Sequence, residues 1–105
     1  RKKGQLDRAI QDYGQAIRLK PDHVNAWSNR GAAYRKKGQL DRAIQDFDQA
    51  IRLKPDFTAA LYNRGFAYEQ LGDKGKALRN YKKAYALGYR HPLLLYRLRK
   101  LGALR

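Results

Sequence analysis

The chain has 105 residues and a net charge of +15, with 24 Lys and Arg residues against 9 Asp and Glu residues. It has no cysteine, which excludes disulfide bonds, thiolate metal sites and thiol catalysis within these residues. No apolar run approaches the roughly 20 residues that a membrane-spanning helix needs, and no signal-like segment follows the first residues. We therefore expect no membrane span and a cytoplasmic location.

The positive charge is spread over the whole length rather than gathered in one segment. Such a charge attracts acidic peptides, nucleic acid or anionic lipid. It is equally compatible with a solvated basic surface that has no ligand, so charge alone does not choose a partner.

An internal repeat organises the sequence. Residues 1–22 and 35–56 differ at only two positions, where Tyr13 aligns with Phe47 and Gly14 aligns with Asp48. The segment WSNRGAAY at residues 27–34 aligns with LYNRGFAY at residues 61–68, with the same offset as between residue 1 and residue 35. Self-similarity at a fixed period of this length is typical of stacked repeat proteins.

Six helices are predicted in chain order, from apolar residues spaced by three and four and from the residues that end helices. Gly38 interrupts the second apolar stripe, and Pro55 ends the third helix because the residue before a proline avoids the α region. Asp22 and Asp56 are placed to cap the helices that follow them. The predicted helices span about residues 5–19, 22–36, 39–53, 56–70, 73–87 and 92–101.

Small and large residues alternate along these helices. Gly31 and Gly65 lack a β-carbon and are expected to let a neighbouring helix approach closely, with Phe47 and Tyr81 filling the spaces beside them. In the final segment, Leu94, Leu98 and Leu101 lie on one face, and the sequence no longer follows the repeat. Here we expect the basic residues to face water: Arg97, Arg99 and Lys100.

These features resemble the tetratricopeptide repeat family. The resemblance implies an all-α solenoid of antiparallel helix pairs, wound as a right-handed superhelix with a concave groove that holds peptides or partner proteins. It divides one domain into half a repeat at 1–23, full repeats at 24–57 and 58–91, and a C-terminal capping helix within 92–105. The matching residues in the first full repeat are Trp27, Gly31, Tyr34, Ala43, Phe47, Ala50 and Pro55. Those in the second are Leu61, Gly65, Tyr68, Ala77, Tyr81 and Ala84, and the partial repeat contributes Ala9, Tyr13, Ala16 and Pro21.

No grouping of residues predicts catalysis, a metal site or a cofactor, so we expect a protein that is not an enzyme. His23 and His91 stand two periods apart with Phe57 between them, which indicates a repeated contact position between units rather than metal ligands. Arg30 and Arg64 occupy half-buried positions, where an arginine needs a partner. We favour an ion pair with an aspartate of a neighbouring helix over anion binding.

The first helix of each full repeat faces the groove in the related family, and its residues between the packing stripes are the candidates for ligand binding. Asn29 and Asn63 stand one period apart, and an amide can both donate to and accept from a peptide backbone. They could equally serve hydrogen bonds between helices. The peptide-binding candidates are Asn25, Ser28, Asn29, Arg35, Lys36, Tyr62, Asn63, Phe66 and Gln70.

The leading functional hypothesis is a protein-interaction scaffold for a peptide of acidic or mixed charge. One alternative is a helical repeat that binds nucleic acid through its basic surface, with Tyr62, Phe66, Tyr89 and Tyr96 as exposed aromatic residues. Another is a designed or recently duplicated scaffold without a natural ligand, which the near-identity of residues 1–22 and 35–56 suggests.

The first helix also predicts self-association. Its apolar stripe resembles one that packs on a preceding helix in the next unit, so one side of it is expected to remain uncovered. The helix is then expected to fray or to pack against another copy, most simply as a homodimer. The residues of this stripe are Leu6, Ile10, Tyr13 and Ile17.

Overall fold

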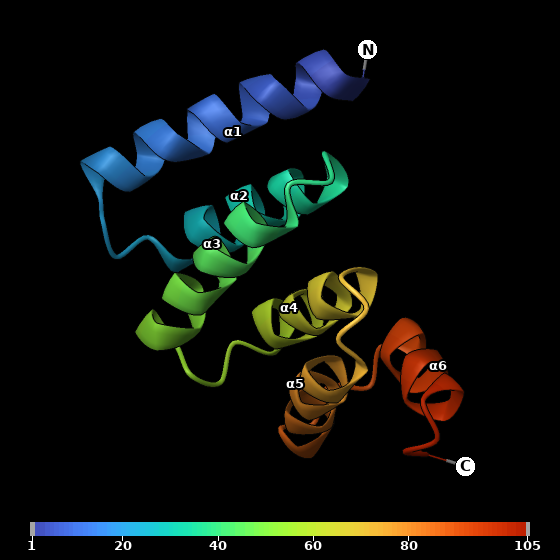
Figure 1. Cartoon of the computed structure of the whole chain (residues 1–105). Coiled ribbons are helices and arrows are strands. Elements are labelled where there is room, and N and C mark those ends of the chain that lie inside the picture. The colour runs from blue at the N-terminus through green and yellow to red at the C-terminus, as the bar shows by residue number, and fades with distance from the viewer. Residues whose placement is uncertain (1, 105) are drawn as a thin grey trace.

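The computed structural model describes residues 2–104, which form six α-helices and no strand within that range. The helices follow one another along an elongated stack, with α1 at one end and α6 at the other (Figure 1). This arrangement confirms the all-α solenoid. The helices are α1 (Lys2–Leu19), α2 (Val24–Lys36), α3 (Leu40–Leu53), α4 (Thr58–Gln70), α5 (Lys74–Ala86) and α6 (Pro92–Lys100).

Helix ends follow the glycine and proline signals. Gly38 and Gly72 adopt φ values of 82° and 86° directly after α2 and α4, a left-handed conformation that glycine enters without steric cost. Pro55 acts as predicted, because Lys54 before it is extended, with φ −143° and ψ 90°, and α3 ends at Leu53.

The predicted caps at Asp22 and Asp56 are wrong. The residue before α2 is His23, whose Nδ1 accepts a hydrogen bond from the backbone N–H of Ala26 at 3.3 Å. Phe57 precedes α4 at the same point of the next repeat and makes no side-chain cap. Both helices therefore begin later than the predicted 22 and 56, since the chain enters them through a turn in which both aspartates are exposed.

His91 caps α6 in the same way, with its Nδ1 accepting from the N–H of Leu93 at 3.1 Å. The spacing of the two histidines therefore reflects the N-cap position, which recurs once in every repeat. The helices that follow begin at Val24, Thr58 and Pro92, each one repeat period after the last. Although the sequence pattern breaks after residue 91, the helix register continues, and α6 occupies the place of the first helix of another repeat.

The two glycines contact large rings, as predicted. A β-carbon on Gly31 would lie 2.8 Å from Phe47 Cε1, and one on Gly65 would lie 2.7 Å from Tyr81 Cε1. Both distances are shorter than real β-carbon contacts, so only glycine allows α2 to meet α3, and α4 to meet α5, at this separation. Phe47 and Tyr81 are consequently fully buried.

Helix α6 packs its leucines into the core of the second full repeat. Leu94 and Leu98 are buried in one cluster with Leu61 and Tyr81. The expectation that Arg97 faces water is wrong, because its side chain is only 16% exposed and lies against α4. Arg99 and Lys100 are exposed as expected.

The ion pair predicted for Arg30 is present. Its guanidinium on α2 donates to both carboxylate oxygens of Asp46 on α3, at 2.8 and 2.9 Å. The hydrogen bond to Asp46 raises the pKa of Arg30 despite partial burial. Arg64 on α4 donates to Asp48 on α3 at 2.8 Å and to Asn80 on α5 at 2.7 Å. These arginines therefore join consecutive helices.

Candidate functional site

Three helices of equivalent register, α2, α4 and α6, bring two arginines onto one phenylalanine. The Cζ of Arg35, from the end of α2, lies 4.5 Å from the ring centroid of Phe66 on α4. The Cζ of Arg97, from α6, lies 4.0 Å from the same centroid. Cation–π contacts of this kind hold a guanidinium without neutralising it. We call the surface formed by these three residues the arginine–phenylalanine face.

Neither arginine of this face is fully hydrogen-bonded. The Nε of Arg35 and the Nε of Arg97 are both buried and have no hydrogen-bond partner among the residues that the structure describes. Burial lowers the pKa of Arg35, and the positive charge of Arg97 lowers it further. Buried donors without acceptors are costly, so these two Nε atoms are a cost that the packing of this face leaves uncompensated.

Glu69 is the carboxylate next to this face. It accepts a hydrogen bond from the Tyr81 hydroxyl at 2.8 Å, and Arg97 Nη1 lies 3.3 Å from both of its oxygens. Lys100 Nζ is 3.8 Å from Glu69 Oε2. Burial, with the hydrogen bond to Glu69, raises the pKa of Tyr81 well above its usual value. One carboxylate thus faces two cations, Arg97 and Lys100, and the region keeps a positive charge.

The predicted peptide-binding residues fall into three groups. Tyr62 is 8% exposed and stacks on Phe66 with ring centroids 6.4 Å apart, and Gln70 accepts from Arg35 Nη1 at 3.4 Å. Tyr62, Phe66, Gln70 and Arg35 are therefore brought together. Ser28 is only 5% exposed and offers little to a ligand. The others lie at the surface: Asn25, Asn29 and Lys36 are exposed, and Asn63 is half-buried.

Arg97 was absent from the sequence-based candidates. It stands one repeat period after Asn63, which stands one period after Asn29, so all three hold the same position in successive helices of equivalent register. The repeat offset could have identified it. It was missed because the apolar pattern breaks before α6, which made this helix appear to be a separate tail.

The stripe proposed for self-association lies on α1, which packs along α2 (Figure 1). Ile17 is buried, at 9% exposure, whereas Leu6, Ile10 and Tyr13 are half-buried. The structure therefore uses one end of the stripe to hold α1 on α2 and leaves the rest partly open.

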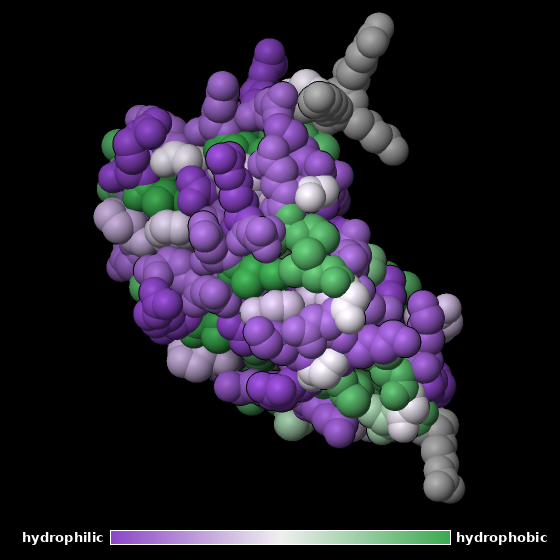
Figure 2. All heavy atoms as spheres, in the orientation of Figure 1, coloured by the Kyte–Doolittle hydropathy of each residue, from purple (hydrophilic) through white to green (hydrophobic). Residues whose placement is uncertain are grey.

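Within residues 2–104, no helix is long and apolar enough to cross a membrane. The same range contains no group of three or more His, Cys, Asp or Glu side chains close enough to hold a metal ion. Figure 2 shows a mainly hydrophilic face interrupted by small, separate hydrophobic patches.

Matches to known protein families together cover residues 1–91. The family described as TPR repeat matches residues 1–38 and 31–72, and the one described as Tetratricopeptide repeat matches residues 58–91. The chain belongs to the tetratricopeptide repeat family. A comparison with curated proteins finds no match.

Several solved structures superpose closely on this chain. The first TPR of Spaghetti (RPAP3), bound to the HSP90 peptide SRMEEVD, has a TM-score of 0.89 and 26% identity, covering 93% of this chain and 78% of that one. A crystal structure of MamA has a TM-score of 0.76 and 31% identity, covering 79% of this chain and 48% of that one. The TPR domain of Arabidopsis OM64, with a TM-score of 0.89 and 24% identity over 94% of this chain and 82% of that one, shows likeness of fold alone.

Proposed function

We propose that this chain is a protein-interaction scaffold that binds an acidic or mixed-charge peptide along α2, α4 and α6. The observation that carries the proposal is the arginine–phenylalanine face, where Arg35 and Arg97 flank Phe66 and keep buried Nε donors without partners among the described residues. A carboxylate is the acceptor that suits a guanidinium best, because the hydrogen bonds are charge-assisted.

The surroundings of this face support a peptide. Asn29, Asn63 and Arg97 form a row at one-repeat intervals, and two amides in a row can pair with an extended backbone. The Phe66 ring offers an apolar contact between the two charges. The similar structure of RPAP3 holds a peptide, SRMEEVD, that contains two glutamates and an aspartate. A peptide with acidic side chains beside an apolar one fits this arrangement.

The proposal can be tested by fluorescence anisotropy with labelled SRMEEVD and with SRMQQVN, which replaces each side-chain carboxylate by an amide. We expect saturable binding that is about tenfold tighter for the acidic peptide, the discrimination of one good charge-assisted hydrogen bond. Arg97→Gln should remove this preference. Arg18→Gln, an equal charge change at an exposed position on α1, should leave it intact. Equal affinity for both peptides would contradict the proposal.

The asparagines require a separate comparison, because they could instead support neighbouring helices. Asn29→Ala and Asn63→Ala are expected to weaken SRMEEVD binding several-fold without lowering the thermal midpoint. Asp41→Ala, an exposed change on α3, serves as the control. If the asparagine variants lose stability instead of affinity, they have a structural role.

Nucleic-acid binding has weaker support. Four aromatic residues were expected to stack on bases. Tyr62 is buried, Tyr89 is half-buried beside it and Phe66 lies between two arginines, which leaves Tyr96, at 55% exposure, as the open ring. A row of exposed rings is what sequence-independent binding of single strands uses. Anisotropy with a labelled single-stranded oligonucleotide across a salt series separates this function from peptide binding.

A further inference from the structure

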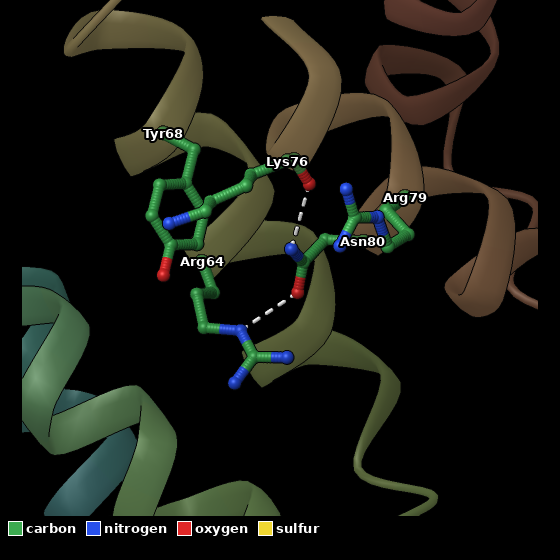
Figure 3. Close-up of a pocket in the computed structure, with 5 residues that line it drawn as sticks. All are labelled: Arg64, Tyr68, Lys76, Arg79 and Asn80. Atoms are coloured by element: carbon green, nitrogen blue, oxygen red, sulfur yellow. Dashed lines mark hydrogen bonds between the residues drawn. The ribbon is translucent and has the colours of Figure 1, made fainter. Parts of the chain in front are cut away.

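A second cationic site lies on the opposite side of α4. Arg64 and Tyr68 from α4, with Lys76, Arg79 and Asn80 from α5, line an open pocket of about 220 Å³ (Figure 3). At 3.6 residues per turn, Arg64 lies about 200° around the helix from Phe66. The pocket is therefore separate from the arginine–phenylalanine face and does not depend on the function proposed for it.

The residues of the pocket are held in place by one another. Asn80 accepts from Arg64 Nε at 2.7 Å through its Oδ1 and donates to the backbone carbonyl of Lys76 at 2.8 Å through its Nδ2 (Figure 3). Lys76 Nζ lies 5.4 Å from the centre of the Tyr68 ring. Arg79 is exposed and has no hydrogen-bond or ion-pair partner within residues 2–104. Neither of the two α5 cations, Lys76 and Arg79, thus forms an ion pair in that range.

The preceding repeat provides an internal comparison. There Arg30, Tyr34 and Arg42 hold the positions of Arg64, Tyr68 and Lys76, and Arg42 lies 5.7 Å from the Tyr34 ring in the same way. In that repeat, however, Asp46 accepts two hydrogen bonds from Arg30 and neutralises it.

Two substitutions make the later repeat more positive. Asn80 stands where the earlier repeat has Asp46, and Arg79 stands where it has Gln45. The first change removes a negative charge and the second adds a positive one, so each raises the net charge of the repeat by one. Asp48 offsets one of these two increases in charge, because it pairs with Arg64 Nη1. The equivalent position one repeat earlier is Gly14, which has no charge to pair with Arg30. The pocket still holds three cations facing a single carboxylate.

We propose that this pocket between α4 and α5 binds a phosphate group, with Arg79, Lys76 and the remaining donors of Arg64 as its ligands. A phosphate presents several acceptor oxygens, which suits a pocket lined by one ammonium and two guanidinium groups. The volume is below that of pockets for drug-sized ligands, which favours a small anionic group. Because the pocket is open to solvent, its affinity falls as ionic strength rises.

Pyrophosphate and glycerol 3-phosphate are the probes, titrated into the full chain at low salt and followed by amide chemical shifts. Shifts that saturate and concentrate on α4 and α5 support the site. Saturation by pyrophosphate alone identifies a free diphosphate as the ligand, and saturation by glycerol 3-phosphate as well identifies a phosphate ester. Absence of saturable shifts with both probes overturns the proposal.

Two variants copy the preceding repeat and so preserve a residue pattern that the fold already accommodates. Arg79→Gln should weaken binding about tenfold, the loss of one charge-assisted contact. Asn80→Asp should abolish saturable binding because the new carboxylate pairs with Arg64, as Asp46 pairs with Arg30. Arg18→Gln is the charge-matched control on α1. Equal weakening by Arg18→Gln and Arg79→Gln would show a general charge effect and overturn the site.

Discussion

Arg30 on α2 and Asp46 on α3 form a two-point ion pair, with Nε to Oδ2 at 2.8 Å and Nη2 to Oδ1 at 2.9 Å. The Asp46 side chain is 5% exposed and that of Arg30 is 22% exposed. One repeat later, Arg64 pairs with Asp48, whose side chain is 42% exposed. The same arginine position thus uses a buried partner in one repeat and a half-exposed partner in the next.

This difference predicts unequal losses of stability. Asp46→Ala leaves the Arg30 guanidinium partly buried without its carboxylate, and we expect it to cost about 2–3 kcal/mol of unfolding free energy. Asp48→Ala removes a solvent-screened pair and should cost less than about 1 kcal/mol. Urea denaturation followed by circular dichroism measures both. Equal denaturation midpoints for the two variants would show that burial does not set the strength of these pairs.

The contact of Gly31 with Phe47 predicts that even alanine is too large at this position. Gly31→Ala places a methyl group 2.8 Å from the ring and should destabilise the chain by about 1–3 kcal/mol, because α2 and α3 must move apart. Gly31→Leu should cost more. Gly75→Ala is the control, because its methyl group meets only Asp73 Oδ1 at 3.7 Å and should stabilise α5 by up to about 1 kcal/mol. Thermal melts should therefore shift in opposite directions.

The fold was predictable because the repeat presents the same steric signals several times. Gly31 and Gly65 mark close helix contacts, and Gly38 and Pro55 mark helix ends, and these roles depend on backbone geometry that follows from residue type. The caps were not predictable in this way. An aspartate is the stronger capping residue on average, but the turns after Pro21 and Pro55 place His23 and Phe57 at the helix starts instead.

The candidate site was predictable only in part. The repeat register placed Arg35, Phe66 and Gln70 on one side of the stack, and the structure brings them together. Arg97 depended on α6 continuing that register after the apolar pattern had broken. The unpaired Nε donors of Arg35 and Arg97 were not predictable, because they arise from side-chain burial across three helices, which a single sequence does not reveal.

Gly14 on α1 predicts a stabilising substitution. A β-carbon there would lie 3.6 Å from Arg30 Nη1, and the equivalent position one repeat later is Asp48, which pairs with Arg64. Gly14→Asp should therefore pair with Arg30 from the α1 side. Gly14→Asn is the neutral control of similar shape and helix propensity. We expect the aspartate variant to be up to about 1 kcal/mol more stable than the asparagine variant. A gap that persists unchanged in about 1 M NaCl would contradict an ion pair, because salt screens it.

Helix α1 differs from its near-copy α3 in how far its apolar side is covered. Phe47, Ala43 and Ala50 on α3 are fully buried, and the Gly31 contact shows that Phe47 faces α2. Their equivalents on α1, Tyr13, Ala9 and Ala16, are only half-buried. In Figure 1, α1 lies at the end of the stack, with α2 on one side of it. Within residues 2–104, the side that corresponds to the α2-facing side of α3 is therefore the less covered one.

We predict that the chain self-associates through this side of α1, as a symmetric dimer at high concentration. Covering a large apolar side chain contributes roughly 1.5–3 kcal/mol, and closed two-fold pairs are the commonest homo-oligomers. Tyr13 and Ala16, rather than buried Ile17, are the residues to change, because Ile17 also holds α1 on α2. Sedimentation equilibrium should give a dimer for the parent chain and a monomer for Tyr13→Glu with Ala16→Glu. Gln11→Glu with Gln15→Glu adds the same charge at exposed positions of α1 and should leave the dimer intact. A parent chain that stays monomeric at millimolar concentration, with α1 amides protected from hydrogen exchange, would show that α1 is stable on α2 without a second copy.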